Sequence, residues 1–129
     1  QWDLGNSNIN KFKVKFENVL NSLPKSSEVL LIFGEIDCRL DSGIIKHKNK
    51  FPRKSLKEIT VTTVENYLTY VFKQNTNYKH NIIIQGVPCP NIDIEKHSPK
   101  SVSKLIRTVS ILNSEIKKKS SQRQNKDEI

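Results

Sequence analysis

Apolar residues recur at spacings of three and four between Asn8 and Leu23, a pattern that predicts an amphipathic helix. The expected core face consists of Phe12, Phe16, Val19, Leu20 and Leu23. Pro24, followed by Ser26 and Ser27, predicts the end of this helix. The N-terminal part of the chain is therefore expected to pack one helical face against a core.

Two short apolar runs show no alternation of apolar and polar residues. They are VLLIF at 29–33 and NIIIQGVP at 81–88, and both are bounded by turn residues. Runs of this length and composition are typical of strands that are buried on both faces, as in a parallel sheet. We expect two neighbouring parallel strands here.

Two further helices are expected around the second strand. Ser55 with Glu58 three residues later resembles a capping box, and it precedes an apolar stripe. This stripe consists of Ile59, Val64, Tyr67, Leu68, Val71 and Phe72. The last helix should begin at Ser98 or Ser101, with a face of Val102, Leu105, Ile106, Val109, Leu112 and Ile116. The segment 40–53, rich in Lys and containing Gly and Pro, is expected to form a loop or irregular cover.

The order helix, strand, helix, strand, helix predicts an α/β fold with right-handed crossovers. We expect a three-layer sandwich with a mostly parallel, flavodoxin-like sheet, incomplete because two strands are few for such a sheet. Residues 1–119 are expected to form one partial domain, which suits a chain of 129 residues. Residues 120–129 are expected to form a basic, disordered tail.

The chain has 22 Lys and Arg against 13 Asp and Glu, a net charge of +9 that raises the question of a nucleic-acid partner. The basic residues are spread along the chain, with clusters at 46–54 and 117–119 and little aromatic interleaving. A nucleic-acid footprint should form one face with stacking residues, so this distribution argues against it.

Two cysteines, Cys38 and Cys89, are too few for a disulfide scaffold, and their spacing matches no zinc signature. Because each follows a predicted strand, a bridge between them stays open. A reduced, cytoplasmic chain without cofactor or metal is the expectation. No apolar run reaches the length of a membrane span, so no membrane association is expected, and the oligomeric state is not predicted.

Polar groups follow both strands, at the place where open parallel sheets hold their ligands. The segment after the first strand reads GEIDCR (34–39) and the segment after the second reads GVPCPN (86–91). The candidate site-lining residues are Gly34, Glu35, Asp37, Arg39, Pro88, Cys89 and Asn91. Gly34 would permit a sharp turn, and Arg39 could bind an anion or pair with Glu35 or Asp37. An ion pair that closes the turn and a role in binding or catalysis are both open.

The remaining reactive side chains favour structural roles. Cys38 has acidic neighbours and no nearby His, which favours a buried, inert thiol over a nucleophile. The three histidines, His47, His80 and His97, lie singly in polar stretches and are expected to be solvated.

The whole order of blocks resembles the SGNH/GDSL-type hydrolase family. An apolar strand, FGEIDCR, an amphipathic helix, IIIQGVPCPN and a helix carrying RTVSILNSEIKK follow one another. The match is to the branch whose third block reads GEIDCR where other members read Gly-x-Asn-Asp. It spans Gly34 to Lys118, about two thirds of the chain. The resemblance implies a flavodoxin-like sandwich that hydrolyses esters, often acyl groups on carbohydrates, with a Ser, His and Asp triad.

Carried over by position, Gly34 matches the glycine of the block and Asp37 its final aspartate. Ile36 falls where other members have the oxyanion Asn, and its side chain cannot donate a hydrogen bond. Gly5, 31 residues before Ile36, is compatible with the family's second oxyanion glycine. GNS (5–7) resembles the nucleophile block, but no apolar strand precedes it, so Ser7 is not expected to be the nucleophile.

No catalytic residue is identifiable in this chain. The resemblance places the nucleophile block before residue 1 and the block with Asp and His after one more strand. An inactive SGNH-hydrolase-like domain, related to esterases acting on acylated carbohydrates, is therefore the leading hypothesis. The alternatives are a non-catalytic α/β module that binds an anion or sugar, and a basic protein associated with nucleic acid.

Overall fold

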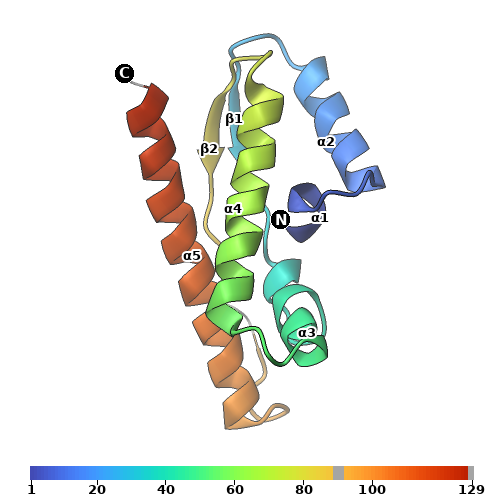
Figure 1. Ribbon diagram of the computed structural model, residues 1–129, viewed down its shortest axis with the longest axis vertical. Helices are drawn as coiled ribbons and strands as arrows, with labels where there is room; N and C mark the ends of the chain where they lie inside the picture. Colours follow the sequence, from blue (N-terminus) through green and yellow to red (C-terminus); the bar gives the residue numbers. More distant parts are fainter. Residues whose placement is uncertain (89–91, 128–129) are drawn as a thin grey trace.

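The computed structural model describes residues 1–88 and 92–127, and of residues 123–127 only the backbone. Its elements follow in the order α1 (Trp2–Gly5), α2 (Lys11–Ser22), β1 (Glu28–Leu31), the short 3₁₀ helix η1 (Ile36–Cys38), α3 (Gly43–Lys50), α4 (Leu56–Asn75), β2 (Asn81–Ile84) and α5 (Pro99–Asp127). Figure 1 shows α4 in the centre, with α5 along one side and α1, α2 and α3 along the other.

The two predicted strands pair in parallel. Their register runs from Glu28 opposite Asn81 to Leu31 opposite Ile84, and α4 lies between them in the chain. The predicted α/β class is therefore confirmed, with about 60% of the chain in helices and two strands in the described sheet. Both strands are shorter than the apolar runs that predicted them.

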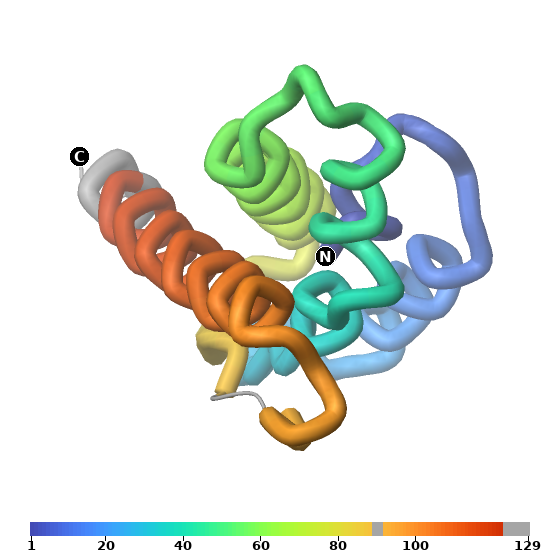
Figure 2. The backbone as a smooth tube through the Cα atoms, turned by 90° about the horizontal axis from the view of Figure 1, so that it is seen from below, coloured from blue at the N-terminus to red at the C-terminus, as the bar shows by residue number. Residues whose placement is uncertain are grey.

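The expectation that both faces of the strands are buried is wrong. Leu31 is buried on the face that α4 covers, whereas Leu30, Ile32 and Ile83 on the other face keep 53%, 63% and 47% of their surface exposed. Figure 2 shows the strands beneath α4, and in the described part of the chain no helix covers their opposite side. An apolar run without alternation marked the strands correctly but did not show how many faces are covered.

Helix α4 forms the centre of the core. Its predicted stripe is buried at Ile59, Val64, Tyr67, Leu68 and Val71, and Thr60 and Thr63 are buried beside it. The Thr60 and Thr63 hydroxyls donate to carbonyls one turn earlier, at 2.7 and 2.8 Å. These hydrogen bonds satisfy both polar groups inside the helix.

The other two predicted helical faces are buried in part. On α5, Leu105, Val109, Leu112 and Ile116 are buried, while Ile106 is exposed. On α2, Phe16 and Leu20 are buried, while Phe12 and Val19 are exposed. The spacing of three and four therefore predicted both helices correctly, but it assigned more residues to their buried faces than the structure buries.

Helix ends follow the expected capping chemistry. The Ser55 hydroxyl accepts a hydrogen bond from the Glu58 N–H at 3.0 Å, as the capping-box pattern predicts. At the start of α5 the Ser98 hydroxyl accepts from the Ser101 N–H at 3.1 Å, and Pro99 takes the first helical position. Within the described residues, no helix combines the length and apolar character of a membrane span.

Two segments differ from the sequence-based expectation. The segment 40–53 contains α3 instead of a loop, because Ile44 and Ile45 are buried in the core and anchor a helical turn. The tail expected to be disordered from residue 120 continues the helix α5 as far as Asp127. The Lys-rich composition of these two segments suggested a loop and a disordered tail, but the same composition is compatible with the solvated face of a helix.

Candidate functional site

The chain turns sharply at the exit of β1. Gly34 has φ +113°, a value that side chains of L-residues rarely allow, and η1 follows at once. A Cβ atom on Gly34 would lie 2.6 Å from Gln1 Nε2 and 2.8 Å from Val87 Cγ2. The glycine therefore lets the exit of β1 lie against both the N-terminal segment and the exit of β2.

The carboxylate of Asp37 is buried and binds the start of α1. Its Oδ1 accepts a hydrogen bond from the Trp2 N–H at 3.0 Å, and its Oδ2 lies 2.7 Å from the amino nitrogen of Gln1. Main-chain nitrogens at the start of α1 thus occupy both carboxylate oxygens. In this position Asp37 joins η1 to α1.

The backbone around Asp37 is packed as tightly as its side chain. Gly43 has φ +58°, and a Cβ atom there would lie 2.5 Å from the Asp37 carbonyl oxygen. The side chain of Gln1 adds a second link, because its Nε2 donates to the Phe33 carbonyl at 3.1 Å. Gln1 and Trp2, the GEIDCR segment and Gly43 therefore pack together in one compact junction.

Arg39 takes no part in this junction. Its guanidinium donates through Nε and Nη2 to Glu35 at 3.0 and 2.9 Å, and more than half of each side chain is exposed. This hydrogen bond raises the pKa of Arg39. Of the two predicted partners, Arg39 therefore pairs with Glu35 and not with Asp37, and solvent screening leaves such a pair little effect on stability.

The thiol of Cys38 is buried, as the sequence predicts. Burial, followed by the negative charge of Asp37, raises its pKa to about 12. A nucleophilic cysteine needs a thiolate near neutral pH, so this thiol is suited to packing and not to catalysis.

The three histidines have three different surroundings. His80 is buried, so the expectation that it is solvated is wrong. His47 lies between Trp2 and Phe51, with ring centroids 4.8 and 4.6 Å away, and His97 is exposed. Burial, with the charges of Lys54 and Lys50, lowers the pKa of His47. Among the described side chains no hydroxyl or thiol hydrogen-bonds to an imidazole.

Gly5 does not serve as an oxyanion donor here. Its N–H donates to the Gln1 carbonyl at 3.0 Å within α1. A Cβ atom on Gly5 would lie 2.8 Å from the Tyr67 nitrogen, so the missing side chain allows α1 to approach α4. The glycine therefore has a packing role that its place in a polar segment did not indicate.

The exit of β2 is fixed by α5. The Val87 N–H donates to Asn113 Oδ1 at 2.7 Å, and Asn113 Nδ2 donates to the Val87 carbonyl at 2.9 Å. Pro88 is exposed beside it, while Cys89 and Asn91 lie outside the described residues. Through Val87, which also contacts the Gly34 position, the two strand exits are neighbours as predicted for parallel strands.

Sequence reasoning missed an aromatic group beside the first basic cluster. Lys50 Nζ and Lys54 Nζ lie 5.7 and 5.9 Å from the centroid of the Phe51 ring, which is half-exposed and packs against the tilted ring of His47. We call Trp2, His47, Lys50, Phe51 and Lys54 the Phe51 patch. The spacing of four between His47 and Phe51 within the Lys-rich segment was the available signal.

No family model, no curated protein and no solved structure matches this chain. Among the described residues there is also no group of three or more His, Cys, Asp or Glu side chains that could hold a metal ion.

Proposed function

We propose that this chain is an SGNH-hydrolase-like α/β domain whose parent architecture is the three-layer, flavodoxin-like sandwich. Its relatives would be esterases acting on acylated carbohydrates, and the chain itself would not hydrolyse esters. Support comes from the parallel arrangement of β1, α4 and β2, with GEIDCR at the exit of β1 and beside the exit of β2.

The observation that carries the second half of this proposal is that, among the described side chains, no hydroxyl or thiol hydrogen-bonds to an imidazole, and the buried carboxylate of GEIDCR, Asp37, is engaged elsewhere. Both of its oxygens bind main-chain nitrogens of residues 1 and 2, so the carboxylate has a structural role. A triad would need a nucleophile hydrogen-bonded to an imidazole and that imidazole oriented by a carboxylate. His47, the histidine near α1, instead packs between two aromatic rings.

The experiment is hydrolysis of a chromogenic acetyl ester by the full chain. We expect the same rate as in buffer, and the same rate for the Ser7→Ala variant, which lacks the hydroxyl of the GNS segment. Saturable turnover that Ser7→Ala abolishes would contradict the proposal and identify a serine esterase.

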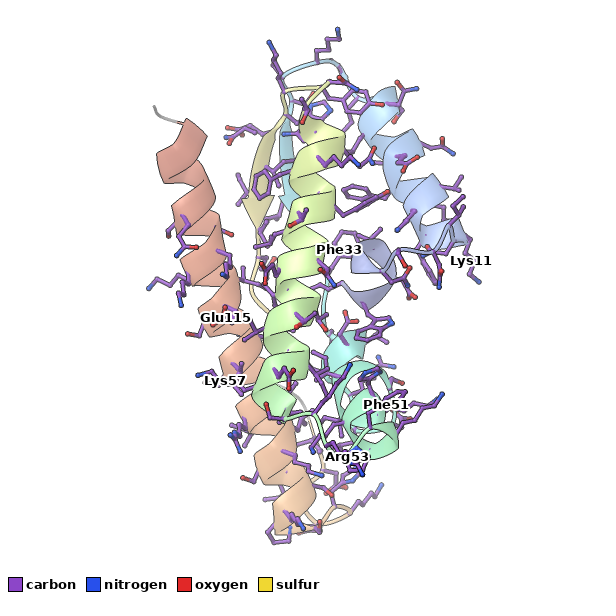
Figure 3. All side chains as sticks on the ribbon, viewed as in Figure 1. Lys11, Phe33, Phe51, Arg53, Lys57 and Glu115 are labelled. Atoms are coloured by element: carbon purple, nitrogen blue, oxygen red, sulfur yellow. The ribbon has the colours of Figure 1, made fainter. Side chains whose placement is uncertain are left out.

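A second candidate function, binding of an acidic or sulfated carbohydrate, is favoured by the Phe51 patch. Aromatic rings offer flat apolar faces to sugar rings, and ammonium groups beside them bind anionic substituents. Figure 3 shows Phe51 and Arg53 close together in the segment after α3, so a further cation adjoins the patch. Arg39 is less suited to clamp an anion, because two of its nitrogens already bind Glu35.

Fluorescence of Trp2 can test this candidate, since the chain has one tryptophan. We expect a heparin-derived oligosaccharide to change the fluorescence, and the double variant Phe51→Ala/Lys54→Ala to weaken binding at least about tenfold, or 1.4 kcal/mol. The matched control is Lys11→Ala/Phe12→Ala, which removes a similar exposed pair with Nζ 5.3 Å from the ring centroid. Equal losses of affinity in the two double variants would mean that binding depends only on net charge, which would contradict a site at Phe51. Tighter, salt-sensitive binding of a single-stranded oligonucleotide would favour nucleic acid instead.

A further inference from the structure

The outer edge of β2 carries unpaired main-chain groups. The ladder to β1 uses the N–H groups of Asn81 and Gln85, which donate to Ser27 and Leu31 at 2.9 and 3.0 Å. Because the main-chain groups of a strand alternate in direction, those of Ile82 and Ile84 point away from β1. Figure 1 shows this edge on the side of β2 that faces α5.

Asparagine side chains close both ends of this edge. Asn75 accepts from the His80 N–H at 3.0 Å and donates to the His80 carbonyl at 2.8 Å. Asn113 makes the same pair of hydrogen bonds with Val87 at the other end. Each amide supplies the one donor and one acceptor that a residue of a neighbouring strand would supply. The main-chain groups at the two ends of the edge, in His80 and Val87, thus have hydrogen-bond partners, whereas those of Ile82 and Ile84 between them are open.

A groove of about 610 Å³ runs along this open edge. Its walls are the β2 segment on one side and α5 on the other, with α4 contributing Phe72 and Asn75; the α5 residues are Asn113, Ile116, Lys117, Ser120 and Ser121. The hydroxyl oxygen of Ser120 is buried there and has no hydrogen-bond partner among the described residues. The groove therefore combines walls of mixed apolar and polar side chains, two half-buried strand positions with open main-chain groups, and an unpartnered hydroxyl.

The edge lacks the usual protection against strand addition. Natural edge strands carry charges, prolines or bulges, or are covered, because unpaired N–H and C=O groups attract other strands. From Asn81 to Val87 this segment has neither a charged residue nor a proline. The open main-chain groups call for an extended backbone as their partner, and α5 lines the other side of the groove.

Charge indicates the composition of this strand. Lys117 is the charged side chain among the described residues that line the groove, and the chain as a whole carries +9. We propose that the groove between β2 and α5 binds an extended peptide segment of another protein, which carries an acidic residue opposite Lys117. The segment adds to β2 as a third strand through the main chain of Ile82 and Ile84.

The probe for this proposal is a fluorescein-labelled hexapeptide of alternating valine and threonine with one glutamate, titrated into the full chain by anisotropy. Its matched control is the same peptide with alternate amides N-methylated along one edge, which cannot form a strand ladder. We expect the N-methylated peptide to bind at least about tenfold more weakly, because it cannot make the main-chain hydrogen bonds to Ile82 and Ile84. Equal binding of the two peptides would overturn the proposal.

Two protein variants locate the peptide. Ile84→Pro removes an outward N–H and leaves the β1 ladder intact, so it should abolish binding, whereas Ile83→Thr changes only the exposed face and should bind normally. Lys117→Glu should weaken the glutamate peptide and strengthen a lysine peptide. Binding that is unaffected by both Ile84→Pro and Lys117→Glu would place the peptide elsewhere. Concentration-dependent dimerisation of the free chain that Ile84→Pro abolishes would assign the edge to a second copy instead. This inference does not depend on the proposed function.

Discussion

The Nε2 atom of His80 lies 3.1 Å from the carbonyl oxygen of Leu20, a residue sixty positions earlier in the chain. The Nδ1 atom of the same ring accepts a hydrogen bond from the Ser27 N–H at 3.1 Å. Since Nδ1 accepts, Nε2 carries the proton and donates. The buried imidazole of His80, the residue directly before β2, therefore links this strand to α2 and to the segment before β1.

The first prediction concerns this imidazole. His80→Ala should lower the free energy of unfolding by about 2–4 kcal/mol, because it leaves the buried Leu20 carbonyl and the partly buried Ser27 N–H without partners. His97→Ala is the matched control, since His97 is exposed, and it should change stability by less than about 0.5 kcal/mol. Urea denaturation followed by circular dichroism measures both. Equal effects would show that His80 is not a structural link.

The second prediction separates the two charged residues of GEIDCR. Asp37→Ala should lower the free energy of unfolding by about 2–3 kcal/mol, because the start of α1 loses its acceptor. Asp37→Asn keeps one acceptor and should lose less. Arg39→Ala should leave the melting temperature nearly unchanged, because its ion pair is exposed. A clear drop for Arg39→Ala with none for Asp37→Ala would contradict the geometry of this junction.

The third prediction concerns the turn after β1. Gly34→Ala places a methyl group against Gln1 and Val87 in a backbone conformation that alanine avoids, so unfolding should become easier by more than about 1 kcal/mol. Lys79→Gly is the opposite case, since Lys79 has φ +54° and glycine accepts that conformation without strain. Thermal melts should move down for the first variant and stay level or move up for the second. Equal tolerance of both would show that the turn is not strained.

The fourth prediction concerns Cys38 at alkaline pH. Its pKa in the folded chain is about 12 against an ordinary value of 9.0, so above pH 9 the unfolded chain loses its thiol proton first. The free energy of unfolding should therefore fall as pH rises from about 9 towards 12, and the buried hydroxyl of Tyr67, whose pKa burial also raises, adds to this fall.

Thiol labelling checks the same residue directly. In a Cys89→Ser background, Cys38 should react slowly with a thiol reagent at pH 8 and quickly once urea unfolds the chain. The unfolded chain serves as its own control for the intrinsic rate. Fast labelling of the folded chain would mean that the thiol is accessible and that its pKa is lower than burial requires.

The sequence predicted the order of the main helices and strands, because apolar periodicity and capping residues are local signals. The Ser55 cap and the buried stripe of α4 are examples. It also placed Asp37 and Gly34 at a strand exit. It did not predict which partner each polar group would take, because partners such as Trp2 for Asp37, or Leu20 for His80, are distant in sequence.

Burial on individual faces was the other weak point. Leu30 and Leu31 are identical residues in one apolar run, yet the first is exposed and the second is buried. Their difference depends on where α4 lies and not on their own chemistry. Helix α3 was not predicted for a similar reason, because the two isoleucines that pack it into the core, Ile44 and Ile45, lie in a Lys-rich segment.

The parallel pairing of β1 and β2 has a consequence for folding kinetics. Asn81, the partner of Glu28, lies 53 positions later in the chain (81 − 28), so no hairpin can start the sheet and no ladder hydrogen bond forms between near neighbours in the chain. Closing such a long loop is entropically costly and slow, and helix formation is much faster. Helix α4 therefore has to form and dock first, and it acts as the template on which two otherwise unrelated extended segments find their register.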